Sequence, residues 1–341
     1  MRREKSSTVA LALGLIVMTL IGQSYSQLTV GFYAGKCKGK KNANANANAD
    51  ADVDVDVEQL IFDIVESAFK KHPTLVAAML RMLFHDCFVG GCDASILLEG
   101  AGSEKTAGPN ETVRGYKLID AVKSAVEKRC RGVVSCADII VIVTRATVFL
   151  ASGNWYDVKT GRRDGSISSA DLAMLNLPPP NEPVPSAIAK FQAKNLTVQD
   201  FVLLMGGHTV GISHCKNFRD RLYNYKGVPR MSDPNIPKDF LEFLKQTCPE
   251  FGSSSNSTVL DQLTPNVVDN GFYKAIGGRK GVLQIDQDIA LDPVTSPIVS
   301  KLANNSTDFI HKFGVALNNL AEVGVLIGSQ GQIRKFCRFV N

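Results

Sequence analysis

The chain has 341 residues, of which 45% are hydrophobic and 21% charged, and its formal net charge is +5 at pH 7. This composition is that of a globular protein, and it excludes a collagen-like chain, a wholly disordered chain and a protein with several membrane spans. A chain of this length can form one large domain or two smaller ones.

The first residues have the pattern of a secretory signal peptide. A basic start precedes an apolar run over 9–22 and a small-residue segment that ends at Ser26. The run is too short to cross a bilayer, so a signal anchor is the less favoured alternative. We therefore expect a signal peptide over 1–26 and a secreted mature chain over 27–341.

The net charge gives little reason to expect a polyanionic partner. The leader carries Arg2, Arg3 and Lys5 against Glu4, so its removal lowers the formal charge from +5 to +3. No block of lysine and arginine stands out beyond 36–41. A nucleic-acid partner is therefore not expected.

The cysteine count and the sequons also indicate secretion. The chain has eight cysteines, and an even number in a secreted protein predicts disulfides whose pairing the sequence leaves open. Asn-x-Ser/Thr sequons, which fit passage through a secretory compartment, begin at Asn110, Asn195, Asn256, Asn304 and Asn305.

A strict two-residue repeat, NANANANADADVDVDV over 42–57, differs from the rest of the chain. Its first half has too little apolar surface to offset the entropy of ordering it, which predicts an exposed low-complexity insertion. The alternation at its end would also suit an edge strand, the less favoured alternative. We expect the repeat to loop out and to add nothing to the core.

From residue 58 on, apolar residues recur mainly at helical spacing, and long segments with strand periodicity are scarce. Thr197 and Asp200 have the spacing of a capping box, and 175–185 is predicted to be a proline-rich loop. The predicted fold class is all-α, without an internal repeat. Helices are expected over 58–69, 73–84, 118–128, 137–151, 199–206, 218–223, 239–247 and 307–327.

Arg81 and His85, in the run RMLFHDCFVGGCDAS, are the first candidate catalytic pair. Residues four apart project from one face of a helix. A neutral imidazole can take a proton from one oxygen of a peroxide and return it to the other, while a guanidinium stabilises the charge that develops as the O–O bond breaks. A structural role for the pair is the alternative.

The residues that follow predict a cation site. Asp86, Asp93 and Ser95 supply carboxylate and hydroxyl oxygens around the glycine-containing segment 89–91, a set that suits calcium although it lacks the EF-hand order. The cysteines on either side of the glycines could form a local bridge. A zinc site made by these cysteines and His85 is disfavoured by the secretory signal and the spacing.

His208, in the run LLMGGHTVG, is a candidate axial ligand of a haem iron. It follows two glycines at the end of an apolar helical stretch, where small residues allow a large flat group to approach the backbone. A core or cap role is the alternative. A ligand histidine needs an acceptor for its second ring nitrogen, and Asp286 in KGVLQIDQD is a candidate.

Several runs, taken in this order, closely resemble the secreted plant haem peroxidases, class III of the plant peroxidase superfamily. The resemblance covers nearly all of 27–341 and includes both histidine motifs and all eight cysteines. It implies the all-α peroxidase fold, two helical halves that enclose a b-type haem. The runs are RMLFHDCFVGGCDASILL, VVSCADI, WYDVKTGRRD, MGGHTVG, TPNVVDNGFY and GQIRKFC.

The resemblance also implies roles for individual residues. Arg81, His85, Phe84 and Asn110 correspond to the distal residues that act on hydrogen peroxide, and Asn110 should be too buried to carry a glycan. His208 corresponds to the iron ligand, with Asp286 as its acceptor. Two Ca²⁺ sites are implied, a distal one formed by Asp86, Val89, Gly91, Asp93 and Ser95, with Glu104 near it, and a proximal one formed by Thr209, Asp261, Thr264, Val267 and Asp269.

Substrate, disulfides and location follow from the same resemblance. Pro178 corresponds to the proline beside the haem edge where phenolic donors bind. The implied location is the extracellular space or cell wall, with the vacuole as the alternative, and a monomer that is not an integral membrane protein is expected. The implied disulfides are Cys37–Cys130, Cys87–Cys92, Cys136–Cys337 and Cys215–Cys248.

The predicted activity is the reduction of hydrogen peroxide to water with one-electron oxidation of phenolic donors. The expected roles are peroxide catabolism, the response to oxidative stress and the cross-linking of wall phenolics. The alternative is a secreted protein that holds haem and calcium and binds wall polysaccharide, with little catalytic activity.

Overall fold

The computed structural model describes residues 28–40, 52–253 and 255–341. The predicted signal peptide over 1–26 lies outside these residues, as does the part of the repeat up to residue 51. Within the described residues no helix is both long and apolar enough to cross a membrane.

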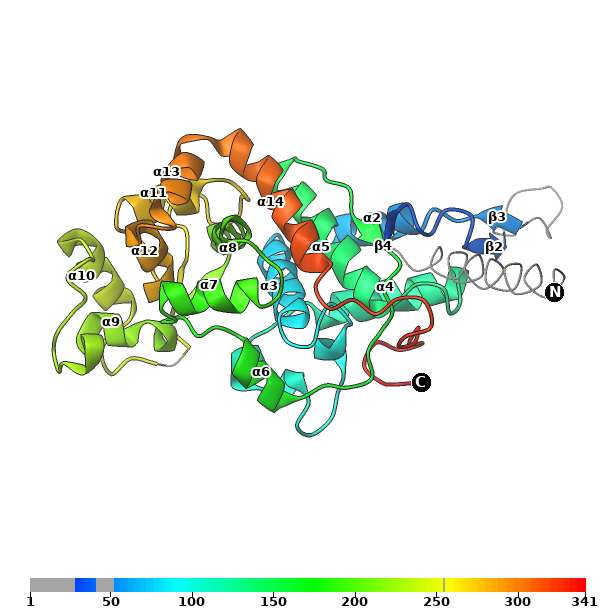
Figure 1. Cartoon of the computed structure of the whole chain (residues 1–341), viewed down its shortest axis with the longest axis horizontal. Helices are drawn as coiled ribbons and strands as arrows, with labels where there is room; N and C mark the ends of the chain where they lie inside the picture. The colour runs from blue at the N-terminus through cyan, green and yellow to red at the C-terminus, as the bar shows by residue number, and fades with distance from the viewer. Residues whose placement is uncertain (1–27, 41–51, 254) are drawn as a thin grey trace, which may run out of the picture.

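The described chain is mostly helical, as the sequence predicts (Figure 1). The α-helices are α2 Val57–Lys71, α3 Leu75–Cys87, α4 Tyr116–Arg129, α5 Cys136–Ser152, α6 Ala170–Asn176, α7 Val184–Gln192, α8 Val198–Met205, α9 Arg219–Tyr223, α10 Lys238–Thr247, α11 Gly271–Gly277, α12 Gln284–Leu291, α13 Ser296–Asn304 and α14 Ser306–Ala321.

Short 3₁₀ helices and strands connect the α-helices. The 3₁₀ helices are η1 Ser95–Leu97, η2 Glu104–Thr106, η3 Gly108–Asn110, η4 Gly206–Thr209, η5 Cys215–Asn217 and η6 Tyr225–Gly227. The strands are β1 Thr29–Val30, β2 Lys38–Lys40, β3 Asp52–Asp54, β4 Lys159–Thr160, β5 Ile212–His214 and β6 Ser257–Val259. They form three antiparallel pairs, β1 with β4, β2 with β3 and β5 with β6.

The first helical half is built around α5. This helix is largely apolar, and every residue from 136 to 148 is buried, as expected for a helix inside a core. It packs against α2, α3 and α4. Ser135 caps its N-terminus by accepting a hydrogen bond from the Asp138 amide at 3.0 Å.

The second half contains α7, α8 and the helices from α11 to α14, with α9 and α10 at one end (Figure 1). Its core includes the aromatic residues Tyr273, Phe309 and Phe313, which pack edge-to-face and at a tilt. The predicted capping box at Thr197 and Asp200 is confirmed at the start of α8. Contacts of α3 with α14 and η4 join the two halves.

Helix prediction was correct in most places and wrong in two respects. The last helix ends at residue 321 and not at 327, because the chain turns into a left-handed conformation at Gly324, whose φ is +57°. Helices α6, α7, α11, α12 and α13 were missed, since they are short and have few periodic apolar positions. The predicted loop 175–185 is shorter than expected, and only 177–183 is non-helical.

The end of the repeat departs from the predicted loop. Asp52–Asp54 forms β3, which pairs with β2 so that Lys38 lies opposite Asp54. Asp56 then caps α2 by accepting a hydrogen bond from the Gln59 amide at 3.0 Å. Val57 is 1% exposed. The expectation that the repeat adds nothing to the core is therefore wrong at this end.

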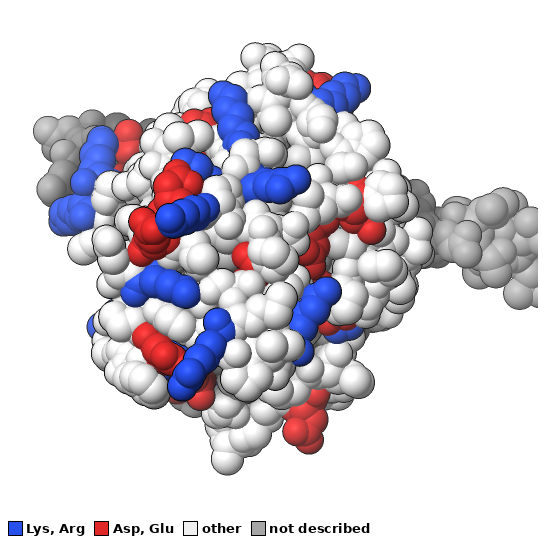
Figure 2. All heavy atoms as spheres, turned by 90° about the vertical axis from the view of Figure 1, so that its left-hand side faces the viewer, with Lys and Arg blue, Asp and Glu red and all other residues white. Residues whose placement is uncertain are grey.

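The four implied disulfides are all present, namely Cys37–Cys130, Cys87–Cys92, Cys136–Cys337 and Cys215–Cys248. On the face at the α9 and α10 end of the molecule, positive and negative side chains are interspersed (Figure 2). That face has no continuous basic patch of the kind that binds a polyanion.

Candidate active site

Helix α3 carries the predicted distal pair at its C-terminal end. Most apolar residues of α3 are buried in the core. Packing of this face sets the orientation of the helix and therefore of the face that carries Arg81 and His85. Arg81 and His85, one turn apart on that face, are only partly buried. The Nε–H of Arg81 points to Nε2 of His85 at 3.4 Å, so both side chains face the same space.

Two hydrogen bonds fix the tautomer of His85. The Asn110 amide nitrogen donates to the carbonyl oxygen of Glu104 at 2.8 Å, so its Oδ1 faces His85. Nδ1 of His85 lies 2.5 Å from that oxygen and must donate to it. Nε2 is therefore unprotonated, and its lone pair, which faces the Nε–H of Arg81, can accept a proton.

The pKa of His85 is lowered to about 3. Burial is the largest cause, the charge of Arg81 adds to it, and the hydrogen bond with Asn110 opposes both. The imidazole is consequently neutral at neutral pH, which is the state that a general base requires.

Arg81 is held by Pro109 and Thr112, two residues that the sequence analysis did not identify. Its Nη1 donates to Oγ1 of Thr112 at 2.9 Å and its Nη2 to the carbonyl oxygen of Pro109 at 2.7 Å. Asn110 and Thr112 also form a sequon, which hid this role. Because Asn110 is 1% exposed, the expectation that it is too buried to carry a glycan agrees with the structure.

His208 lies on η4, and its partner is Asp286 in the first turn of α12. Nδ1 of His208 donates to Oδ1 of Asp286 at 2.7 Å, and the Leu283 amide donates to the other carboxylate oxygen at 3.3 Å. Burial lowers the pKa of His208, but the charge and hydrogen bond of Asp286 outweigh it and raise the pKa overall. Nε2 is left free as a basic ligand for a metal.

The surroundings of His208 fit a large flat cofactor. Its side chain keeps 33% of its surface accessible although Asp286 beside it is 1% exposed. A Cβ added to Gly207 would meet no atom within 4 Å outside its two chain neighbours, so the backbone next to His208 borders open space. The charge of Arg81 also lowers the pKa of His208. A partly accessible imidazole with a free Nε2, next to a glycine that leaves space open, fits a haem.

Phe84 lies beside His85, and Pro178 lies in a loop that contacts α12. Phe84 stacks on Phe88 with ring centroids 4.6 Å apart and meets the His85 ring edge-on. Pro178 is in the short loop between α6 and α7, which is tied to α12 by a hydrogen bond from the Ile285 amide to the Pro180 carbonyl. Helix α6 also contacts η3, which carries Asn110.

The loop after α3 gathers the oxygen atoms of the predicted distal cation site. Oxygens of Asp86 accept hydrogen bonds from the amides of Ala94 and Ile96 at 2.9 and 3.3 Å. Asp93 accepts from the Ser95 amide at 3.0 Å. Ser95 Oγ and Glu104 Oε2 are buried without a hydrogen-bond partner.

The electrostatics of this loop favour a bound cation. Burial and then the charges of Asp93 and Glu104 raise the pKa of Asp86 well above its usual value. Burial and the Asp93 charge likewise raise the pKa of Glu104 to about 8. No group of three histidine, cysteine or carboxylate side chains forms a metal site among the described residues. A cation here would depend on hydroxyl and carbonyl oxygens as well, which is the mixed donor set typical of calcium.

The oxygen atoms of the predicted proximal cation site lie closer together than those of the distal site. Thr209 Oγ1 lies 3.1 Å from Asp261 Oδ2, 3.4 Å from the Val267 carbonyl and 3.4 Å from Asp269 Oδ1. Thr264 Oγ1 lies 3.3 and 3.0 Å from the same two carboxylates. Five oxygen-bearing residues from two distant segments therefore meet in one place beside His208.

Arg334 is a further residue that the sequence analysis missed. It is fully buried, and its Nη2 donates to the carbonyl oxygens of Ala94 and Asp93 at 2.6 and 3.3 Å. Its amide donates to Asp164 at 2.8 Å. The C-terminal segment thus fixes the backbone of the distal loop at Asp93 and Ala94. The only sequence signal for this residue was its place in the run GQIRKFC.

Comparison with known proteins matches most of the chain to one family. The model of the peroxidase family matches residues 61–305. Peroxidase 60 of Arabidopsis thaliana is 43% identical to the chain over 98% of the chain and 96% of its own length. Peroxidase 57 and peroxidase 39 of the same plant are 40% and 37% identical and cover 96% and 98% of the chain.

Proposed function

The chain belongs to the peroxidase family and is a peroxidase, and from this premise we propose that it holds haem b in a cavity between His85 and His208 and reduces hydrogen peroxide there. The observation that carries the proposal is the fixed tautomer of His85. Its Nε2 is an unprotonated base that faces Arg81, and the bond from Nδ1 of His208 to Asp286 leaves Nε2 of His208 free.

Proton movement is the part of the reaction that this chain performs. Nε2 of His85 takes a proton from one oxygen of the peroxide and returns it to the other, so that this oxygen leaves as water. Arg81 stabilises the negative charge that develops on the leaving oxygen. Asn110 keeps the imidazole in the required tautomer by accepting from Nδ1.

Haem b would be held through Nε2 of His208, and when bound it supplies the exchange of single electrons with peroxide and with the donor. Asp286 makes His208 a more basic ligand. Two donor molecules each lose one electron and one proton, and the second water is formed. The overall reaction therefore consumes one peroxide and two phenols.

Phenolic donors are proposed to bind beside Pro178, at the edge of the cavity. Helix α6 leads to this proline and has apolar side chains in contact with water, with Met174 59% and Leu175 73% exposed. An exposed apolar rim next to a partly polar cavity suits aromatic substrates.

Two Ca²⁺ ions are proposed as structural cofactors. The distal ion would be bound by the oxygen atoms of Asp86, Val89, Gly91, Asp93 and Ser95, and the proximal ion by those of Thr209, Asp261, Thr264, Val267 and Asp269. Hard oxygen donors of this number are the ligands that calcium takes. Each ion would neutralise buried carboxylates next to a catalytic or ligand histidine.

The place of action is proposed to be outside the cell. The four disulfides fit an oxidising compartment, and the leader over 1–26 would deliver the mature monomer to the cell wall or, as the alternative, to the vacuole. Peroxide catabolism, oxidative stress and the cross-linking of wall phenolics are the processes proposed. Wall polysaccharide is a further candidate partner.

The His85→Ala variant of the haem-loaded enzyme tests this function. We expect it to retain its haem absorbance and to lose about 10²- to 10⁴-fold in the rate of reaction with hydrogen peroxide, the usual contribution of a general base. His72→Ala, at an exposed histidine in the same chain, is the matched control and should leave the rate unchanged. A wild-type rate for His85→Ala would contradict the assignment, and inactive wild-type enzyme would favour the wall-binding alternative.

A further inference from the structure

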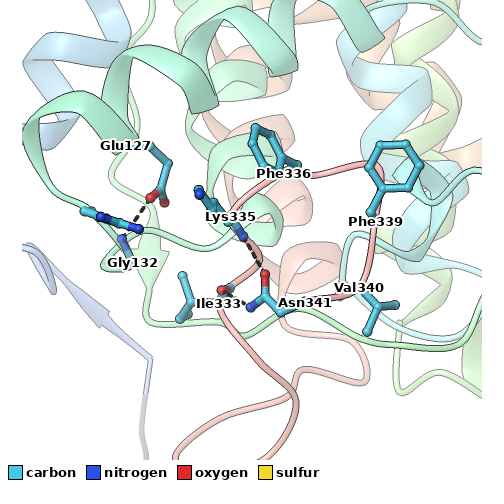
Figure 3. A pocket seen from close by; sticks show the side chains of 9 residues that line it. Glu127, Gly132, Ile333, Lys335, Phe336, Phe339, Val340 and Asn341 are labelled. Atoms are coloured by element: carbon cyan, nitrogen blue, oxygen red, sulfur yellow. Dashed lines mark hydrogen bonds between the residues drawn. The ribbon is translucent and has the colours of Figure 1, made fainter.

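A surface hollow of about 500 Å³ lies against the C-terminal segment 333–341. Figure 3 shows it between this segment and the residues that follow α4. Its volume is in the range of small-molecule sites. None of the residues that line it belongs to the peroxide, haem or calcium groups described above.

The segment that forms one wall is firmly held. The disulfide from Cys337 to Cys136 joins it to the start of α5. The side chain of Asn341 donates to the Ile333 carbonyl at 2.8 Å and accepts from the Lys335 amide at 2.9 Å (Figure 3). The hollow is therefore formed before any ligand arrives, which lowers the entropy cost of binding.

Two aromatic rings extend from this segment into water. Phe336 is 62% exposed and Phe339 is 56% exposed, and both rings project to the same side of the segment in Figure 3. Val340 beside them is 48% exposed. Such rings gain free energy when an apolar or aromatic surface covers them.

Two cations, Arg131 and Lys335, and one carboxylate, Glu127, line the hollow. Glu127 is neutralised by Lys123, whose Nζ lies 2.7 Å from it, and also accepts from the Gly132 amide at 3.0 Å. In contrast, no carboxylate side chain in the described part of the chain lies within 4.0 Å of the Arg131 or Lys335 side-chain nitrogens. Two cations are therefore free to bind an anion.

A neighbouring hollow of about 340 Å³ extends this cationic region. It shares Gly132 and Ile333 with the first hollow and adds Lys36 and Arg163 to its walls. Arg163 donates to the Gln330 carbonyl and keeps its positive charge, since a carbonyl does not neutralise it. An anion that enters either hollow therefore meets positive charge.

We propose that the hollow beside the C-terminal segment binds a small aromatic carboxylate. The carboxylate would lie between Arg131 and Lys335, and the ring would pack against Phe336 and Phe339. A guanidinium recognises a carboxylate through two parallel hydrogen bonds, and the phenylalanines supply the apolar surface. This site is independent of the haem cavity and of the peroxidase reaction.

Calorimetric titration of the haem-loaded enzyme with cinnamate tests the proposal, since cinnamate has the ring and the carboxylate but no phenol hydroxyl. Cinnamamide, which lacks the charge, is the companion ligand. We expect Arg131→Gln to weaken cinnamate binding about tenfold, the range for a charge-assisted pair, and to leave cinnamamide binding unchanged. Phe339→Ser should weaken the binding of both ligands.

Matched variants distinguish this site from others. Arg129→Gln removes an exposed arginine two residues away that does not line the hollow, and Phe251→Ser removes a ring that is 95% exposed elsewhere. Both should bind cinnamate like the wild type. Unchanged cinnamate affinity in Arg131→Gln would overturn the proposal. So would a dimer, seen by analytical ultracentrifugation, that Phe339→Ser abolishes, because a second copy of the chain would then be the occupant.

Discussion

Gly91 and Gly324 touch backbone to backbone, so that a Cβ added to Gly91 would lie 2.3 Å from the carbonyl oxygen of Gly324. The next residue, Cys92, donates its amide hydrogen to the Val323 carbonyl at 2.9 Å. The proposed distal calcium loop is therefore built directly on the turn that ends α14. The two helical halves meet at this contact, six residues after His85 in the chain.

Gly91→Ala is expected to destabilise the enzyme strongly. Gly91 has a φ of +125°, so alanine there suffers both backbone strain and the clash with Gly324. Gly100→Ala is the matched control, because Gly100 has a φ of +141° but a Cβ there would meet no atom within 4 Å. Denaturant unfolding should show that Gly91→Ala loses about 1–3 kcal/mol more than Gly100→Ala, the cost of overpacking. If both variants lost the same free energy of unfolding, the backbone contact between Gly91 and Gly324 would be able to relax without cost.

Asn110→Leu should slow the reaction with peroxide without releasing haem. Leucine has a similar volume but cannot accept from Nδ1 of His85, so the tautomer and orientation of the imidazole are no longer fixed. We expect a fall of about 10- to 100-fold in kcat/KM for peroxide, as for other residues that orient a functional histidine. The KM for the phenolic donor should stay the same. A fall in donor affinity alone would assign Asn110 to the donor site.

Asp286→Asn should weaken the attachment of haem. Asparagine can still accept from Nδ1 of His208, but it lacks the charge that raises the pKa of this ligand. Transfer of haem to apomyoglobin should be about 10- to 100-fold faster than in the wild type. Asp288→Asn, two residues further along α12, is the control and should transfer haem at the wild-type rate.

Removal of calcium with a chelator should lower stability and disturb the haem. With calcium at about 100 times its Kd, a single site contributes about 2.7 kcal/mol to the free energy of unfolding. Because Thr209 is adjacent to His208, loss of the proximal ion should also change the Soret absorbance. Asp261→Asn should reproduce that spectral change in the presence of calcium, whereas Asp239→Asn at an exposed position should not. An unchanged spectrum in Asp261→Asn would contradict a proximal ion coupled to the ligand histidine.

The sequence alone determined a large part of this description. Helical periodicity predicted most of the long helices, and the spacing of Arg81 and His85 placed both on one helix face, because these signals depend only on neighbours in the chain. The pairing of the cysteines and the identity of Asp286 as the partner of His208 came from the family resemblance, since Asp286 is 78 residues away from His208 in the sequence.

Only the tertiary structure decided the contacts between distant segments. The hydrogen bond from Arg334 to the Ala94 carbonyl in the distal loop joins residues 240 positions apart. No local sequence pattern predicts a contact between such distant residues. The sequence shows Thr112 only as part of a sequon, and its hydrogen bond with Arg81 is seen in the structure. The strand at the end of the repeat forms because β2 is available to pair with it. The hollow beside Phe336 and Phe339 likewise exists because a disulfide and hydrogen bonds fold the end of the chain back on α4 and α5. Composition and periodicity specify which residues form helices, whereas the neighbours of a side chain depend on how those helices pack.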